Sequence, residues 1–547
     1  MTVDTGRVGS RAYGALVTVG TSLVVLAFFF RFQIMDGFAH RFGDRYDAMI
    51  EVAILQHWAN VFAGRAVWNV TNYFYPAPDT LGYNDAYFLS GVLYAGFRHL
   101  GLTLVAAAEA VHALLKIAGF FGMAWLIRTA ARAPLRWCLF GATLFTIADL
   151  TLQHANHGQL FTLSLAPFAF ALAWRAGEAL LAGRRRALLI NGAGLALLFA
   201  IWISTAFYLA WFFLFYGAIV ACMLLRRFDR ARWRGLGSAM RREWLILALL
   251  LAVACVSLVP FLIVYLPKSA ETGMHAFAEL RGSAFMPLDY FNAGPSNLLW
   301  HGPLDFLRRT IAPKLKTNPD NIFGFTPFLF AITIWAAIRL RRDMRESALA
   351  GLGLALLVSW ALMFKAFGFV PWWLVYTLVP GAGGIRVIGR FNLLLLVPAI
   401  LIVTDMLARS RRAPLAIAAA ALLLAEQLSS RAPIDLDEAE QLAMIAAVPR
   451  AALAGRPSFY VVSARTYPYP VFSPDYDRIY AHNVDAMVLS EVLNVPTVNG
   501  FSTFEPPHWD FADPLAPDYD DRVRRYAAAS GIAMPTRFDL GGGARPR

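Results

Sequence analysis

The chain has few cysteines and few charged residues for its 547 residues. Its three cysteines, Cys138, Cys222 and Cys255, lie within or at the edge of apolar runs. Because they form no CxxC pair and no spaced framework, the sequence predicts neither structural disulfides nor a cysteine-bound metal. Charged residues make up 16% of the chain and hydrophobic residues 58%. This balance excludes an ordinary set of soluble domains and indicates a polytopic membrane protein.

The alternation of apolar and polar residues that marks a membrane barrel is also absent. The apolar residues instead form runs of about 20 residues, the length that an α-helix needs to cross a bilayer. No internal repeat is apparent, which weakens the interpretation as an inverted-repeat transporter. We predict about eleven crossings and two interfacial segments, at 87–100 and 367–379. Single crossings are predicted at 13–30, 102–127, 244–266, 322–338, 347–363, 391–407 and 414–428. The segments 137–174 and 187–225 are each predicted to form a hairpin of two crossings.

The net charge of +13 comes largely from short basic segments between the apolar runs. These arginine-rich segments are 128–136, 175–186, 226–242 and 339–345. The positive-inside rule predicts that they are cytoplasmic, so the charge does not indicate a nucleic-acid partner. With a cytoplasmic N-terminus and an odd number of crossings, the C-terminal segment is expected outside.

We divide the chain at residue 429. Residues 1–429 form the predicted transmembrane domain, with long outer loops at 31–101 and 267–321. Beyond residue 429, acids, prolines and tyrosines become frequent, and 458–462 has the composition of a buried strand. Residues 430–547 are therefore predicted to form a small extracytoplasmic α/β domain.

The first outer loop carries candidate catalytic acids. If a helix starts after Gly43, then Asp44, Asp47 and Glu51 share one of its faces. Two interpretations are open: Asp44 and Asp47 cap the helix and complement its dipole, or one carboxylate is a general base for an acceptor hydroxyl. Asp85 either reaches the same cavity or caps the helix that follows it.

A hairpin tip carries His154 and His157, which share a face if the tip is helical. Two histidines without a fixed third ligand make an incomplete zinc site, and a polar turn at the interface is the simpler interpretation. The sequence implies no cofactor, and if a divalent cation takes part, Asp44 and Asp47 are its expected ligands.

The glycine-rich segment 380–384 precedes Arg386 and Arg390, which are four residues apart at the start of a helix on the outer face. Exposed backbone N–H groups and two fixed positive charges favour a phosphate site. Arginines beside a crossing also extend toward lipid headgroups, and that alternative stays open. The segment 287–301 mixes aromatic and amide side chains, as sugar-binding surfaces and membrane-interface belts both do.

Seven short motifs are spread over most of the chain. They are Gly43-Asp44, Phe74-Tyr75-Pro76-Ala77-Pro78, Tyr83-Asn84-Asp85, His157-Gly158-Gln159, Pro295-Ser296-Asn297-Leu298-Leu299-Trp300, Ile385-Arg386-Val387-Ile388-Gly389-Arg390-Phe391 and Val498-Asn499-Gly500-Phe501-Ser502. In this order they resemble one branch of the bacterial GT-C-type membrane glycosyltransferases.

The resemblance implies an inverting transferase of the bacterial cytoplasmic membrane. It implies a polyprenyl-phosphate sugar as donor and transfer on the outer face to a hydroxyl of a glycan, lipid or protein. An early aspartate of the first loop is the base in that superfamily, which corresponds best to Asp44 and then to Asp47; the adjacent acid pair of some branches is missing. The expected catalytic residues are Asp44, Asp47 and Asp85, the donor phosphate ligands are Arg386 and Arg390, and the substrate-binding residues are Glu51, His154, His157, Gln159, Asn297 and Trp300.

The main rival is a transporter or flippase of a lipid-linked glycan, without bond chemistry. It requires ionisable residues inside a crossing, and Glu109, His112 and Lys116 lie on one face of the second predicted helix. These groups line a pathway, line the entrance of a cavity, or satisfy one another. A noncatalytic scaffold with a partner-binding tail would leave the acidic loop unexplained.

Overall fold

A computed structural model describes residues 5–318, 321–343, 348–448, 453, 455–462 and 474–540. Of the arginine-rich segment 339–345, residues 344 and 345 lie outside the described residues, as do several parts of the predicted C-terminal domain.

Apolar helices form the main body of the described structure. Seven helical segments are long and apolar enough to cross a membrane: α5 (Leu104–Ala130), α6 (Leu135–Thr146) with α7 (Asp149–Gln153), η2 (Gly158–Leu165) with α8 (Ala166–Leu181), α9 (Arg185–Ile203), α10 (Phe207–Leu225), α12 (Trp244–Thr272), and η6 (Ile388–Arg390) with α18 (Phe391–Ala408). Shorter apolar helices lie in α1 (Thr5–Phe29), α15 (Pro327–Asp343), α16 (Ala348–Met363) and α19 (Ala413–Ala425). The predicted polytopic helical fold is confirmed, and these segments follow the predicted crossings in order.

Shorter elements lie between and beyond these helices. The first outer loop contains α2 (Arg31–Met35), β1 (His40–Arg41), α3 (Asp47–Phe62), η1 (Thr80–Tyr83) and α4 (Phe88–His99). Later connections contain α11 (Arg230–Arg242), α13 (Phe277–Gly282), η3 (Pro287–Phe291), α14 (His301–Thr310), α17 (Trp372–Leu378) and η5 (Ala382–Gly384). The tail contains β2 (Leu436–Asp437), α20 (Glu438–Ala447), β3 (Phe459–Val461), α22 (Pro474–Leu493), α23 (Tyr519–Ala529) and β4 (Thr536–Phe538). The two segments expected at the interface are the short helices α4 and α17.

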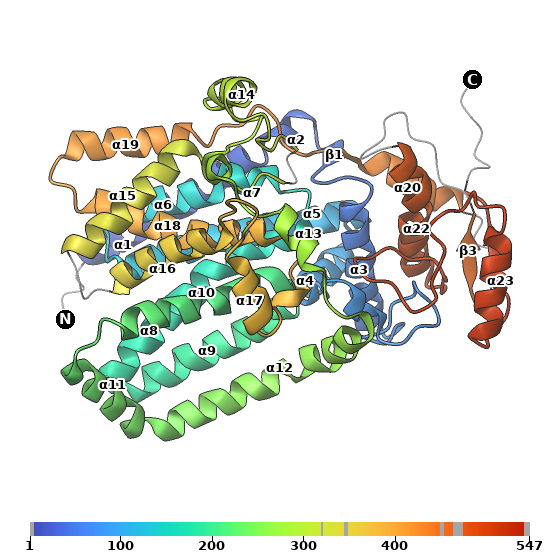
Figure 1. Ribbon diagram of the computed structural model, residues 1–547, viewed down its shortest axis with the longest axis horizontal. Coiled ribbons are helices and arrows are strands. Elements are labelled where there is room, and N and C mark those ends of the chain that lie inside the picture. The colour runs from blue at the N-terminus through green and yellow to red at the C-terminus, as the bar shows by residue number, and fades with distance from the viewer. Residues whose placement is uncertain are drawn as a thin grey trace.

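The long helices run roughly side by side, and the two ends of the bundle differ (Figure 1). The basic helix α11 lies at the same end as the N-terminus, at the left of the view. Helices α3, α22 and α23 lie at the opposite end. The arginine-rich helix and the tail are therefore separated by the length of the bundle.

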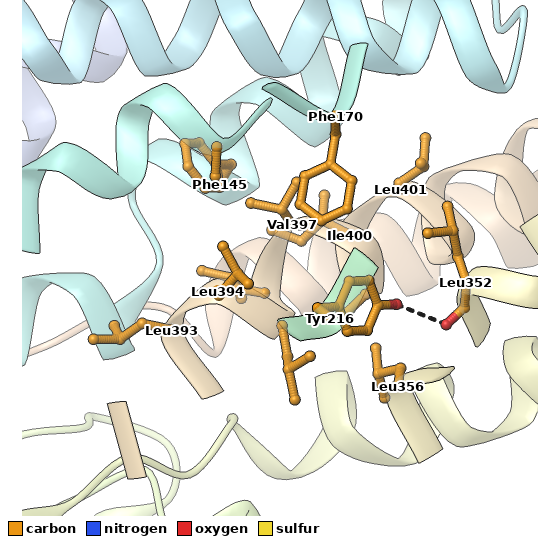
Figure 2. Packing of buried hydrophobic residues seen from close by; sticks show 14 of the residues in the cluster. Phe145, Phe170, Tyr216, Leu352, Leu356, Leu393, Leu394, Val397, Ile400 and Leu401 are labelled. Atoms are coloured by element: carbon orange, nitrogen blue, oxygen red, sulfur yellow. Dashed lines mark hydrogen bonds between the residues drawn. The ribbon is translucent and has the colours of Figure 1, made fainter. Parts of the chain in front are cut away.

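Helix α18 lies in the centre of the bundle. Its sequence is apolar on every side, and 94% of its most apolar window is buried. Figure 2 shows α18 side chains such as Leu394 and Val397 packed near Phe170 and Tyr216. The Tyr216 hydroxyl donates to the Leu352 carbonyl over 2.7 Å, which satisfies the one polar atom of that side chain. By contrast, none of the most apolar window of α12 is buried in the protein, so α12 is suited to face lipid.

The tail packs against the first outer loop. Strand β1 pairs antiparallel with β2, with His40 opposite Asp437, and α22 packs on α3. Between these helices the fully buried His57 and Glu491 lie 3.6 Å apart, from Nδ1 to Oε1. One hydrophobic cluster contains side chains of both regions. Strands β3 and β4 pair in parallel over three residues each, which is too little sheet to bury much area alone.

Candidate active site

Asp44 caps the start of α3. Its Oδ1 accepts hydrogen bonds from the backbone N–H groups of Tyr46, at 2.7 Å, and Asp47, at 2.9 Å. The preceding Gly43 has a φ of +95°, and a Cβ there would lie 2.5 Å from the Cβ of Ala48, so only glycine fits. Asp44 is 7% exposed. The capping interpretation therefore describes Asp44 well.

Asp47, the first residue of α3, is paired with a histidine. Its Oδ2 lies 2.8 Å from Nδ1 of His157, and the Asp47 side chain is 39% exposed. Burial raises the pKa of Asp47, but His157, Arg390 and Arg386 together outweigh it and lower the pKa below the ordinary value. Asp47 is therefore an ionised carboxylate that a solute can reach.

Gly158 allows the hairpin tip to approach α3. A Cβ on Gly158 would lie 1.7 Å from Oε2 of Glu51. Glu51 itself is 2% exposed, and its Oε1 lies 3.1 Å from Nε2 of His112 on α5. The Glu51 carboxylate thus lies against the hairpin tip and His112, and substrate binding by Glu51 stays a prediction.

The segment before α4 brings Asp85 and Tyr87 to the same region. Asp85 Oδ1 accepts from the N–H of Phe207 over 2.8 Å, so it caps α10 and not α4, the helix expected from the sequence. Burial raises the pKa of Asp85, while the Phe207 N–H and Arg390 partly oppose this. The Tyr87 hydroxyl donates to Oε1 of Gln159 over 2.8 Å, which ties this segment to the hairpin tip.

Arg386 and Arg390 follow the glycine-rich loop. The Arg386 N–H donates to the Tyr208 hydroxyl over 2.8 Å, and the Arg390 guanidinium lies over the Tyr208 ring, 5.5 Å from its centroid. The Arg386 side chain is exposed. Within the described residues, Nε of Arg390 is buried without a hydrogen-bond partner. The loop thus presents one exposed guanidinium, and charge-assisted hydrogen bonds from such a group suit an anion.

The acids and the arginines act on one another although more than 300 positions separate them in the sequence. Arg390 and Arg386 both lower the pKa of Asp47, and Arg390 also lowers that of Asp85. The contacts join the two regions at the start of α10, because Asp85 accepts from the Phe207 N–H and the neighbouring Tyr208 hydroxyl accepts from the Arg386 N–H. We call the region between the first outer loop and the segment 381–390 the chamber.

His154 is held as a neutral side chain. Its Nε2 donates to the Ile322 carbonyl over 2.7 Å, and its ring stacks on Phe323 with centroids 4.2 Å apart. Burial, followed by the charges of His157 and Arg390, lowers the pKa of His154 to about 3. Among the residues that the structure describes, no group of three or more His, Cys, Asp and Glu side chains is arranged to hold a metal.

Asn297 and Trp300 lie in a different cluster. Nδ2 of Asn297 donates to Oδ2 of Asp149, at 3.1 Å, and to the Glu426 carbonyl, at 2.8 Å. Nε1 of Trp300 donates to Oε2 of Glu426, which also accepts from the Phe328 N–H at the start of α15. Their polar atoms join separate segments of the bundle, and substrate binding by these two side chains stays a prediction.

The ionisable residues of α5 are partnered inside the bundle. Nζ of Lys116 donates to the Thr151 hydroxyl over 3.0 Å and lies 4.0 Å from the centre of the Phe29 ring. His112 lies 3.9 Å from Glu109 in addition to its contact with Glu51. A small cavity beside Lys116 is lined by Thr151, His154 and Ser164.

The sequence interpretation missed Tyr87 and Tyr208 as parts of the chamber. Tyr87 lies two positions after the Tyr83-Asn84-Asp85 motif, and Tyr208 lies within the predicted hairpin 187–225. An aromatic residue at an interface is so common that neither position was distinctive.

Comparisons with known proteins give a fold-level similarity. No protein-family model and no curated protein matches the chain. Similar solved structures include ArnT from Cupriavidus metallidurans bound to undecaprenyl phosphate, at 15% identity over 90% of this chain and 72% of that chain, with a TM-score of 0.42. They also include the arabinofuranosyltransferase AftD from Mycobacteria, at 15% identity over 76% of this chain and 26% of that chain, with a TM-score of 0.44. A third is the Archaeoglobus fulgidus oligosaccharyltransferase, at 13% identity over 88% of this chain and 62% of that chain, with a TM-score of 0.45. These neighbours are glycosyltransferases of the GT-C type. Because the TM-scores are below 0.5, the proposals below are based on the residues of this chain.

Proposed function

We propose that the protein is a GT-C-type glycosyltransferase that moves a sugar from a polyprenyl-phosphate donor to an acceptor hydroxyl at the outer face of the cytoplasmic membrane. The observation that carries the proposal is the accessible Asp47 carboxylate, 2.8 Å from His157 and within the field of Arg386 and Arg390. A base and an anion site in one chamber are what sugar transfer from a phosphate donor requires.

Asp47 is the proposed base. Its carboxylate accepts the proton of the acceptor hydroxyl while the hydroxyl oxygen attacks the anomeric carbon. The bond from that carbon to the phosphate oxygen breaks, and the phosphate leaves with the electron pair. Attack from the side opposite to the phosphate inverts the anomeric centre. His157 holds the carboxylate in place, and its contact keeps Asp47 ionised.

Arg386 and Arg390 are the proposed partners of the departing phosphate. Negative charge on the phosphate increases as the bond breaks, so fixed cations stabilise the transition state more than the bound donor. The guanidinium N–H groups of these arginines offer the phosphate oxygens charge-assisted hydrogen bonds in addition to charge. The acceptor is a hydroxyl of a glycan, lipid or protein.

The remaining expected residues divide into two groups. His157, Gln159 and Asp85 form the first group, and in this proposal they contact the substrate or support the chamber. Asp44 supports Asp47 through the helix start. We further propose the expected orientation, in which the basic end of the bundle is cytoplasmic and the tail, residues 430–547, is outside.

The test uses purified full-length protein in proteoliposomes with a polyprenyl-phosphate sugar. Wild-type protein is expected to release polyprenyl phosphate and to glycosylate an added acceptor. Movement of the donor across the bilayer without release of polyprenyl phosphate would favour the transporter instead. In cells that lack the protein, a polyprenyl-linked sugar is expected to accumulate. Its chemical identity would show which donor the protein uses. An unchanged lipid-linked pool would contradict the proposal.

A further inference from the structure

A segment of the tail contacts both the first outer loop and the region of the glycine-rich loop. We call residues 497–505 the strap. At its start the Thr497 N–H donates to the Asn72 carbonyl over 2.7 Å, and the Phe74 N–H donates to the Asn499 carbonyl over 2.9 Å. These backbone bonds fix the strap to the first outer loop, independently of side-chain identity.

The middle of the strap lies beside the acidic side of the chamber. The ring of Phe501 lies 6.4 Å from that of Tyr46, the residue before Asp47. The Ser502 hydroxyl donates to the carbonyl of Tyr83, in the segment that carries Asp85. The strap therefore contacts both parts of the chain that supply acids.

The far end of the strap reaches the glycine-rich loop through one histidine. Phe504 stacks on His275, with centroids 4.8 Å apart and planes inclined by 30°. The His275 N–H donates to the Gly383 carbonyl over 3.0 Å, and the Tyr376 hydroxyl donates to the His275 carbonyl over 3.0 Å. A Cβ on Gly383 would lie 2.3 Å from Sδ of Met274, so this contact is close.

His275 lies near the arginines as well. Burial lowers its pKa, Glu279 raises it, and Arg386 lowers it further, so the net direction is downward. A neutral imidazole packs against an aromatic ring without placing another cation beside Arg386. The His275 side chain is therefore suited to connect Phe504 of the strap to the glycine-rich loop by packing.

We propose that the strap positions the glycine-rich loop, through Phe504 and His275, so that Arg386 and Arg390 face the acids. This inference rests on the proposed function for its chemistry. A loop with three glycines has high conformational entropy, and a guanidinium that must meet a phosphate gains from being held in advance. Phe504 is in this view a positioning residue, since it acts through His275.

The first experiment measures amide hydrogen exchange of segment 381–390 in the full-length protein. Phe504→Ala is expected to speed exchange there about 2- to 13-fold, the range for loss of one aromatic pair. Phe538→Ala, which removes an aromatic side chain from β4 instead, is the matched control and is expected to leave this segment unchanged. Phe504→Tyr is expected to restore the wild-type rate. Equal exchange in Phe504→Ala and wild type overturns the inference.

The second measurement separates the donor from the acceptor. In Phe504→Ala the KM for the polyprenyl-phosphate sugar is expected to rise by a similar factor, with the acceptor KM unchanged. A rise in the acceptor KM alone would overturn the inference and make the strap part of the acceptor site. If Phe504→Ala does not fold, His275→Ala tests the same contact from the bundle side, with His275→Phe as the variant that keeps the ring. Hydrogen exchange needs no transfer activity, so failure of the proposed function and failure of this inference are distinguishable.

Discussion

Replacing Asp47 by asparagine tests the proposed base with little change of shape. The amide is isosteric with the carboxylate and still offers an oxygen to Nδ1 of His157, now 2.8 Å from Oδ2. Asparagine cannot take a proton from the acceptor. The chamber should therefore stay assembled while the chemistry is lost.

The size of the loss follows from the role assigned to the carboxylate. General base catalysis contributes about 10² to 10⁴ in rate, so kcat of Asp47→Asn should fall by that factor. At 1.36 kcal/mol for each tenfold change, this corresponds to roughly 2.7 to 5.4 kcal/mol of transition-state stabilisation. Donor affinity should change less, because Arg386 and Arg390 are intact.

Asp44→Asn is the matched control. Asparagine caps a helix about as well as aspartate, so this variant should keep both its fold and most of its activity. The assay is release of polyprenyl phosphate at equal amounts of folded protein, judged by thermal unfolding. Full activity of Asp47→Asn, or a large loss confined to Asp44→Asn, would refute the assignment and restore Asp44, the residue that the family resemblance indicated first.

Three further predictions concern the same chamber. Arg390→Gln should weaken binding of polyprenyl phosphate about 10- to 150-fold, the value of a hydrogen bond to a charged group; unchanged binding by the purified protein would exclude Arg390 from the phosphate site. Gly158→Ala should lower the thermal midpoint, with a cost of about 1 to 3 kcal/mol, because its Cβ would meet Glu51 at 1.7 Å; a midpoint equal to wild type would show that the tip adjusts freely. His157→Gln should move the acidic limb of the kcat/KM profile to higher pH, because the base is active above its pKa and loss of His157 raises the pKa of Asp47; a limb that stays in place would mean that another group titrates.

The helical bundle was predictable because membrane crossings are long, local and apolar. Each run of about 20 apolar residues must satisfy its own backbone hydrogen bonds, so a crossing can be predicted without knowing which helices pack beside it. The same reasoning predicts that Arg386 and Arg390 lie on the same side of the membrane as the acidic loop, because the loop follows the crossing 13–30 and the arginines precede the crossing 391–407.

The proposed division of roles between Asp44 and Asp47 was not predictable from their spacing. It depends on His157, which lies in a hairpin about 110 positions later and reaches Asp47 because Gly158 lacks a side chain. The partner of Asn297 was unpredictable for a related reason. Its amide resembles a sugar ligand in sequence, but it donates to the buried carboxylate of Asp149, 148 positions earlier.

The pairing of β1 with β2 has a consequence for biosynthesis. His40 and Asp437 are opposite one another although 397 positions separate them, and the strap follows about 60 positions later. A ribosome that adds 5 to 20 residues per second needs roughly 20 to 80 s to make that intervening chain. During this interval the nascent first loop lacks its strand partner and its cover. The β1–β2 pair and the strap contacts therefore form only after most of the chain has been made.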